Sequence, residues 1–189
     1  LTIGSSTEPW LIIDNLSQDL SNPLFRTPAV AAYVGLSALM IDQPNPEDFM
    51  LATLISNLGL LKLSSKSLGK NLDDFSEDDT FLYLNHPLTS INMVLERKIP
   101  LPEDIKKIIL NSHENPQGTG FPKGKNCPAN IPIGSQLMQI CETLDSNLLI
   151  IPSYSRFEVS DRRREVLLFP EMNNFSPELI NNLKKIWVA

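Results

Sequence analysis

An apolar repeat with spacings of three and four residues, broken at intervals by proline and glycine, is the feature that most constrains this fold. The first such run begins after Pro28 with Val30, Val34 and Ile41, and Pro46 stands just beyond it. This spacing places apolar side chains on one face of an α-helix, and proline marks helix boundaries. No segment alternates strongly enough between apolar and polar residues to predict a sheet. The sequence therefore predicts an all-α fold, a compact bundle of about six to eight helices.

Proline and acidic residues at the start of the later apolar runs indicate where the other helices begin, because both suit the first helical turn. The expected helices cover about 47–58, 77–85, 88–96, 103–113, 131–148 and 177–187. The pattern over residues 151–170 is ambiguous. The helix after Pro46 is expected to bury Phe49, Met50, Thr53 and Leu54.

The length and composition of the chain set its domain organisation. A chain of 189 residues that is 42% hydrophobic is large enough to bury one sizeable core. We therefore expect one helical domain over residues 23–189, preceded by an extension or linker over residues 1–22. Within that extension, Trp10–Ile13 fits either a short strand or an apolar strip packed on the domain. Because the sequence begins with Leu1 and not with Met, we also expect an upstream region in a longer protein.

The charge and the cysteine content narrow the classes of function. A net charge of −6 argues against a general nucleic-acid-binding surface, which needs a basic face. The dense basic run Arg162-Arg163-Arg164 is interpreted as a solvated face. The two cysteines, Cys127 and Cys141, are too few for a disulfide framework, and no apolar stretch reaches the roughly 18 residues of a membrane span. The sequence therefore predicts a cytoplasmic protein with both cysteines reduced.

The segment from Ser112 to Pro122, Ser-His-Glu-Asn-Pro-Gln-Gly-Thr-Gly-Phe-Pro, places a histidine and a glutamate before a turn rich in glycine and proline. Gly118 and Gly120 allow positive φ angles at two positions, and the proline fixes the backbone at a third. Phe121 lies between glycine and proline, and it is expected to fill a local pocket and hold the loop in place. An ordinary loop between two helices is the alternative interpretation.

This segment resembles the HHExxDGxGYP signature of the HD-GYP family, which are metal-dependent phosphodiesterases that act on cyclic di-GMP. Four other stretches resemble motifs of that family in the same order. They are residues 51–60 (LAALLHDIGK in the family), 85–87 (the HP motif), 131–146 (IPLxARILxVADxFDA) and 175–179 (FDPELV). The resemblance extends over residues 25–189 and implies the compact helical bundle of HD-GYP and HD domains.

The sequence departs from the pattern of the family at the positions that carry its chemistry. Ser56 and Asn57 stand at the His-Asp pair of the family, and Leu60 stands at the lysine that follows. Ser112 stands at the first histidine of the HHE motif. Hydrolysis by two metal ions needs ligands that hold the ions close together, usually with a bridging carboxylate, and Asn57 is a poor bridge. The resemblance therefore implies that these positions are degenerate and that no catalytic residue remains.

Three residues remain at positions where the resemblance implies metal ligands, namely His86, His113 and Glu142. The chain has only two histidines, and both stand at such positions. They are interpreted as hydrogen-bonded relics in a polar pocket that holds no cofactor. The alternative is a site for a single Fe, Mn or Zn ion, with Glu114 as a further candidate ligand.

We expect the two histidines and Glu142 to converge in space whether or not they hold an ion. Asp145 lies one helical turn after Glu142. It is interpreted as the partner of an N–H group or an arginine in preference to a metal ligand. The helices that carry these residues are expected to pack through Leu54, Ile109, Leu137 and Ile140.

The retained fold and the lost ligands predict a catalytically inactive HD-GYP-like module of bacterial cyclic di-GMP signalling, which acts by binding. In the family, the glycine turn is implicated in contacts with diguanylate cyclase domains. The expected partner is therefore a diguanylate cyclase domain or an upstream domain of the same chain. The alternatives are a residual metal-dependent phosphodiesterase and a sensor that binds cyclic di-GMP without cleaving it. The loop residues expected to contact a partner are Gly118, Thr119, Gly120, Phe121 and Pro122.

Overall fold

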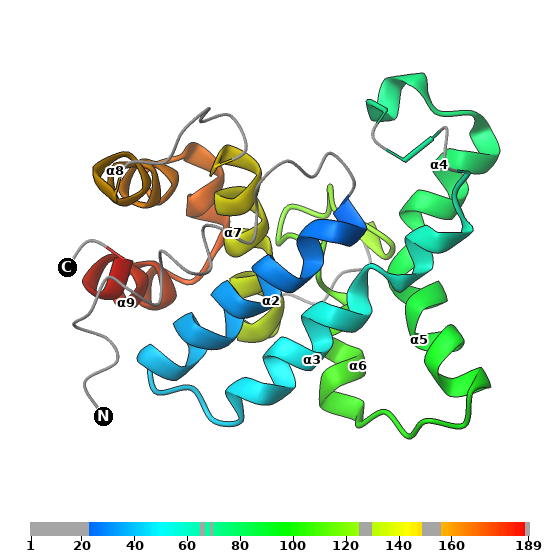
Figure 1. The fold of residues 1–189 in the computed structure, drawn as a ribbon, viewed down its shortest axis with the longest axis horizontal. Coiled ribbons are helices and arrows are strands. Elements are labelled where there is room, and N and C mark those ends of the chain that lie inside the picture. Colours follow the sequence, from blue (N-terminus) through cyan, green and yellow to red (C-terminus); the bar gives the residue numbers. More distant parts are fainter. Residues whose placement is uncertain (1–22, 65–66, 69, 125–129, 149–155, 188–189) are drawn as a thin grey trace.

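The computed structural model describes residues 23–64, 67–68, 70–124, 130–148 and 156–187, and its regular elements are helices (Figure 1). Within these residues there are eight α-helices and no β-strand, which confirms the all-α class. The α-helices are α2 (Pro23–Met40), α3 (Pro46–Ser56), α4 (Glu77–Leu84), α5 (His86–Glu96), α6 (Glu103–Leu110), α7 (Ile133–Leu148), α8 (Arg156–Val166) and α9 (Pro177–Trp187). The short 3-10 helices are η2 (Leu58–Lys62), η3 (Leu72–Asp74) and η5 (Pro170–Asn174).

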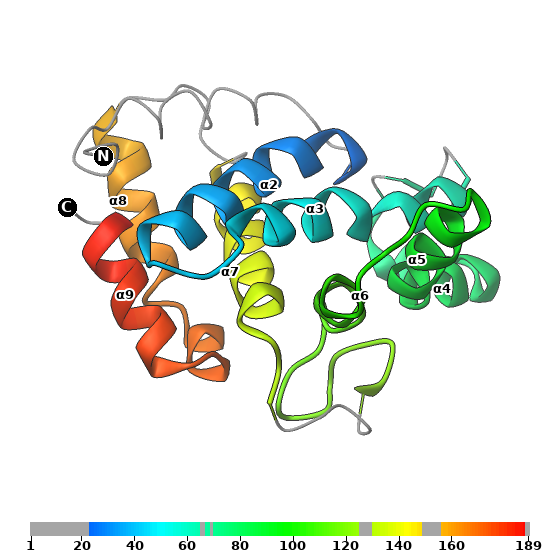
Figure 2. The same cartoon turned by 90° about the horizontal axis from the view of Figure 1, so that it is seen from below.

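A hairpin of α2 and α3 lies at the centre of the fold (Figure 1). Helix α7 packs against α2, and α8 and α9 lie on the same side of the hairpin (Figure 2). On the other side, α6 packs against α3, and α5 packs against both α3 and η2. This arrangement places three elements around the junction of α3 and η2. They are α5, the C-terminal end of α6, and α7.

The core lies between the hairpin and the helices α6, α7 and α9. The apolar faces that the sequence predicts for α6 and α7 are both buried. The indole N–H of Trp187 in α9 donates a hydrogen bond of 3.1 Å to Ser37 Oγ in α2, which joins the last helix to the first described one. The buried residues of the two predicted faces are Ile105, Ile108, Ile109, Leu137, Ile140, Cys141 and Leu144.

Helix α3 buries only part of the face that the sequence predicts, because Thr53 is buried and Phe49 packs against the core, but the other two expected residues are more exposed. Met50 and Leu54 were expected in the core, but they are 38% and 43% exposed. Ala52 and Ile55 are buried in their place. A side chain at Gly35 of α2 would overlap the Met50 side chain, so the two helices approach each other closely where α2 has no side chain. The expected packing through Leu54 is therefore wrong, because Leu54 lies on the exposed side of α3.

Helix α5 begins at His86, before the start near residue 88 that the sequence predicts. A proline in the first turn of a helix needs no partner for a backbone N–H, so Pro87 begins α5 here. The break between α4 and α5 is consequently short, with Asn85 as its connecting residue.

Helix α8 lies within the region whose sequence pattern is ambiguous. Its basic run is not uniformly solvated, because Arg163 is only 5% exposed whereas Arg164 is exposed. Successive residues of a helix point about 100° apart, so a run of three cannot share one solvated face. The interpretation of this run as solvated is wrong at Arg163.

The expected extension over residues 1–22, including Trp10–Ile13, and Cys127 lie outside the described residues. Cys141 is a free, buried thiol, and burial raises its pKa. Of the helices that the structure describes, none combines the length and the apolar character needed to cross a membrane.

Candidate functional site

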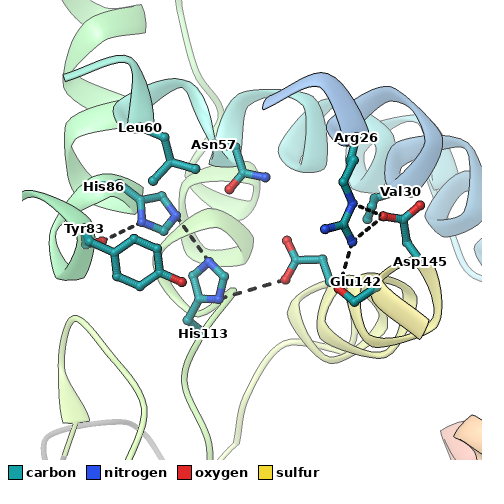
Figure 3. A pocket seen from close by; sticks show the side chains of 10 residues that line it. Arg26, Val30, Asn57, Leu60, Tyr83, His86, His113, Glu142 and Asp145 are labelled. Atoms are coloured by element: carbon teal, nitrogen blue, oxygen red, sulfur yellow. Dashed lines mark hydrogen bonds and ion pairs between the residues drawn. The ribbon is translucent and has the colours of Figure 1, made fainter. Parts of the chain in front are cut away.

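Four segments of the chain bring the expected residues to one cavity of about 170 Å³ (Figure 3). His86 and His113 face each other with their Nε2 atoms 3.2 Å apart, and Glu142 Oε2 lies 4.0 Å from His113 Nδ1. The expected convergence of these three residues is confirmed. The cavity is lined by Arg26, Val30, Asn57, Leu60, Tyr83, His86, His113, Glu142, Asp145 and Ser146.

His86 is positioned by the close approach of η2 to the start of α5. A side chain at Gly59 would overlap the backbone carbonyl of His86, so only glycine permits this approach. Ser90 Oγ accepts a hydrogen bond from the Gly59 N–H at 2.7 Å and donates one to the Ser56 carbonyl at 2.6 Å. Ser90 therefore joins η2 and the end of α3 to α5, and it holds the cavity wall next to His86.

His113 is positioned by the motif loop, which we define as residues 112–122. The Phe121 N–H donates to the His113 carbonyl at 3.1 Å, and the two rings stack with centroids 4.5 Å apart. Phe121 therefore holds the loop as the sequence predicts. Gly118 has a φ of 72°, but Gly120 is not among the glycines with positive φ. Gly120 is instead required by space, because a Cβ there would overlap the His113 carbonyl oxygen.

Glu114 fastens the motif loop and does not line the cavity. Its carboxylate is fully buried and accepts the backbone N–H groups of Lys123 at 2.5 Å and Gly124 at 3.2 Å. Gln139 in α7 donates to the Glu114 carbonyl at 3.0 Å. The sequence suggested Glu114 as a candidate metal ligand. In the structure its carboxylate instead joins the start of the motif loop to the residues that directly follow the loop.

The hydrogen bonds of the histidine pair determine which ring nitrogens carry hydrogen. His86 Nδ1 lies 2.6 Å from the Tyr83 carbonyl oxygen, which only accepts, so Nδ1 is the donor. Burial lowers the pKa of His86 to about 4, and burial together with the neighbouring His86 lowers that of His113 to about 3. Both rings are therefore neutral at pH 7. His86 Nε2 then accepts from His113 Nε2–H, and His113 Nδ1 turns a lone pair toward Glu142.

The carboxylates of α7 have different environments. Burial raises the pKa of Glu142 to about 7, an effect that the Arg26 guanidinium partly offsets. Arg26 donates to Asp145 Oδ2 from Nε at 2.6 Å and to Ser146 Oγ from Nη2 at 2.8 Å. The interpretation of Asp145 as the partner of an arginine is confirmed. Arg26 itself was not singled out in the sequence, although it is a lone charge within an apolar helix.

The four degenerate positions fall into two groups. Asn57 and Leu60 line the cavity, and Asn57 Nδ2 donates to Thr27 Oγ1 at 3.1 Å. Ser56 and Ser112 are fully buried and do not line the cavity. Within the described residues, Ser112 Oγ has no hydrogen-bond partner.

The two imidazoles and Glu142 do not surround one point that a metal ion could occupy. His86 is oriented as metal-binding histidines are, with Nδ1–H on a carbonyl and Nε2 turned inward. That inward nitrogen faces His113 Nε2, whereas Glu142 lies beyond the other nitrogen of the His113 ring. Across the part of the chain that is described, no three His, Cys, Asp or Glu side chains form a group that could hold a metal ion. The residues present do not fit a bound metal in this arrangement.

The chain matches the sequence model of the HD domain family over residues 11–148. Among solved structures, the fold is similar to that of Bd1817, a HDG"Y"P protein from Bdellovibrio bacteriovorus, with a TM-score of 0.57 and 17% sequence identity. The likeness covers 86% of this chain and 53% of that protein, so this chain spans about half of its length. No curated protein matches the sequence. The family match extends over most of the chain, and this chain therefore belongs to the HD domain family, with an HD-GYP-like fold.

Proposed function

We propose that this chain is an HD-GYP-like signalling module that acts by binding and does not hydrolyse cyclic di-GMP. The observation that carries the proposal is Asn57 in the cavity wall, where the family resemblance requires a carboxylate. Its Nδ2 is bound to Thr27 Oγ1, so a neutral amide is held in place at this position. An amide does not offset the positive charge of two metal ions as a bridging carboxylate does.

The other degenerate positions support the same proposal. Leu60 is 3% exposed and stands at the lysine position of the family, so this wall of the cavity offers no cation to a phosphate oxygen. Ser56 and Ser112, at two histidine positions of the family, are packed within the protein outside the cavity. Two imidazole ligands have therefore been replaced by residues that do not reach the site.

The motif loop keeps its structure although the ligands around it are lost, which supports a role in binding. At its tip, Gln117 Nε2 donates to Asn174 Oδ1 in η5 at 2.7 Å, and Thr119 is exposed. A preformed loop binds a partner with little further loss of conformational entropy. A diguanylate cyclase domain or an upstream domain of the same protein is the proposed partner, with cyclic di-GMP as the alternative ligand.

Incubation of the purified protein with cyclic di-GMP, with and without added Mn²⁺ or Fe²⁺, tests the loss of hydrolysis. We expect turnover no faster than the uncatalysed background, because Ser56, Asn57 and Ser112 stand where the family pattern has the ligands that would hold two metal ions. The variant His113→Ala is the control. Metal-stimulated turnover that His113→Ala abolishes would show a residual phosphodiesterase and overturn the proposal.

Calorimetric titration with a diguanylate cyclase domain tests the motif loop as a binding surface. Thr119→Arg places a bulky cation at the exposed tip, and we expect it to weaken binding by about ten-fold or more. Glu47→Ala, an exposed change at the start of α3, is expected to bind as the unchanged protein does. Equal affinity of all three proteins would contradict the role of the loop. A parallel titration with cyclic di-GMP tests the alternative of a nucleotide sensor.

A further inference from the structure

The outer face of the α2–α3 hairpin is apolar, although it is exposed. Helices α6 and α7 pack on the opposite, inner face of the hairpin (Figure 2). Apolar residues recur along the outer face at spacings of three and four, which places them in one row on each helix. The row of α2 is Phe25, Pro28, Ala32, Leu36 and Leu39, and the row of α3 and η2 is Met50, Leu54, Leu58 and Leu61, with Leu51 beside it.

The two rows form one surface, which we call the hairpin face. The Met50 side chain lies over Gly35 of α2, so it joins the row of α3 to that of α2. Six large side chains of this face are between 38% and 64% exposed, namely Phe25, Leu39, Met50, Leu51, Leu54 and Leu61. Together they present on the order of 500 Å² of apolar surface, and a contiguous patch of this size on a protein commonly marks an interaction site.

The charges at the two ends of the hairpin face fit a second copy of the chain in antiparallel orientation. Glu47 stands at the start of the α3 row and Lys62 at its end, and both are exposed. Neither side chain forms an ion pair with a residue that the structure describes. A two-fold symmetric contact uses the same face on both copies. Antiparallel α3 helices then place Glu47 of each copy near Lys62 of the other, whereas parallel helices would bring like charges together.

The length of the hairpin face also favours a second copy over a short segment of the same chain. Helix α2 has 18 residues, which corresponds to about 27 Å at 1.5 Å per residue. The apolar strip Trp10–Ile13 has four residues and spans at most about 14 Å when extended, so it would cover only part of the face. A second hairpin matches the face along its whole length, and two packed hairpins form a four-helix bundle.

The area of the hairpin face is consistent with this occupant. A standard interface buries roughly 800 Å² on each partner, with an apolar centre and a polar rim. The six apolar side chains supply the centre, and Glu47 and Lys62 belong to the rim.

We propose that a second copy of this chain docks on the hairpin face, with the α3 helices antiparallel and the two-fold axis near Leu54, midway between Glu47 and Lys62. The inference does not rest on the proposed function. None of the six exposed side chains lines the cavity or belongs to the motif loop.

Sedimentation equilibrium of the purified protein tests the proposal. At about 10 μM we expect the mass of two chains. Leu54→Glu places a charge beside the two-fold axis in both copies, and we expect it to weaken dimerisation by about 100-fold or more. Leu168→Glu is the matched control, because Leu168 is 69% exposed and lies outside the hairpin face. Circular dichroism melting shows whether both variants remain folded.

Two outcomes of this experiment would overturn the proposal. The first is an unchanged protein that sediments as a single chain at about 100 μM, which would assign the hairpin face to residues 1–22 or to a different protein. The second is a folded Leu54→Glu variant that dimerises as tightly as Leu168→Glu, which would place the contact between copies on another face.

Charge reversal tests the antiparallel orientation. Glu47→Lys brings like charges together at both ends of the contact, and Lys62→Glu does the same with the opposite sign. We expect each single variant to weaken dimerisation by about three- to ten-fold, and the double variant to regain the original affinity to within about two-fold. A double variant that dimerises no better than either single variant would contradict the proposed pairing of the two copies.

Discussion

At the scale of single residues, Gly120 determines how closely the motif loop can approach His113. A Cβ at this position would overlap the His113 carbonyl oxygen, and a backbone atom cannot move aside as a side chain can. We therefore expect Gly120→Ala to lower the free energy of unfolding by about 2 kcal/mol. Urea denaturation followed by circular dichroism measures the change.

Gly134→Ala in α7 is the matched control for this substitution. Its Cβ would meet the side chain of Ile108, which can shift, and alanine also favours the helix. A smaller loss of stability is expected. Equal losses in the two variants would contradict the role assigned to the contact between Gly120 and His113.

Some residues of the cavity could be predicted from the sequence because they stand in motifs. His86, His113 and Glu142 belong to this group. Arg26 does not, because its partner Asp145 lies 119 residues away and no local pattern joins them. Tyr83 was missed as well: its carbonyl accepts from His86 Nδ1 and its ring lies 5.4 Å from the ring of His86, but no motif of the sequence marks either contact.

At the scale of the elements, Ser90 fixes η2 against α5 through two hydrogen bonds at a fully buried position. We expect Ser90→Ala to lower the free energy of unfolding by about 1–3 kcal/mol, because the Gly59 N–H loses its partner in the protein interior. Urea denaturation measures the loss. Thr143→Ala, which removes a bond within α7 to the Gln139 carbonyl, is the control, and it is expected to cost less. A larger loss in the control would contradict the assigned role.

The helices that could be predicted from the sequence are those with one wide apolar face. In α6 and α7 the buried positions recur at helical spacing, so both the helix and its inward face followed from the pattern. In α3 the helix and the burial of Thr53 were predicted correctly, but Leu54 is exposed, and Met50 is only partly covered where it lies over Gly35 of α2. Apolar residues occur on both faces of α3, and only the contact with α2 decides which face is buried.

At the scale of the whole molecule, the cavity gives the stability of the fold a pH dependence. Burial lowers the pKa of His86 to about 4 and of His113 to about 3, below the ordinary value of 6.5. Their contribution to stability is present above pH 6.5 and is lost as the pH falls through these lowered values. Burial raises the pKa of Glu142 from 4.5 to about 7, so its contribution is present below pH 4.5 and is lost as the pH rises through 7.

Between pH 4.5 and 6.5 the unfolded chain binds a proton at each histidine, whereas the folded protein binds one at Glu142. The unfolded state thus binds more protons, and stability rises with pH in this window. Above pH 6.5 only Glu142 differs, and stability falls slightly. These groups are expected to place the maximum near pH 6.5, measured by urea denaturation over a series of pH values.

The double variant His86→Gln/His113→Gln is the control for this pH profile. It removes the two groups that make stability rise with pH and leaves only the raised pKa of Glu142, so we expect the stability of the variant to fall, and not to rise, as the pH increases from 4.5 to 6.5. Stability of the unchanged protein that continues to rise beyond pH 7 would contradict the raised pKa of Glu142.

Under the proposed loss of hydrolysis, the complete burial of Ser56 and Ser112 would oppose the return of the histidines that the family pattern has at these positions. An imidazole ring at either position would have to displace packed neighbours, and overpacking of this kind typically costs about 1–3 kcal/mol. One regained histidine would bring that cost without completing a metal centre. Natural selection would therefore act against each first step. The histidines of the family pattern would therefore be reached only through less stable intermediates.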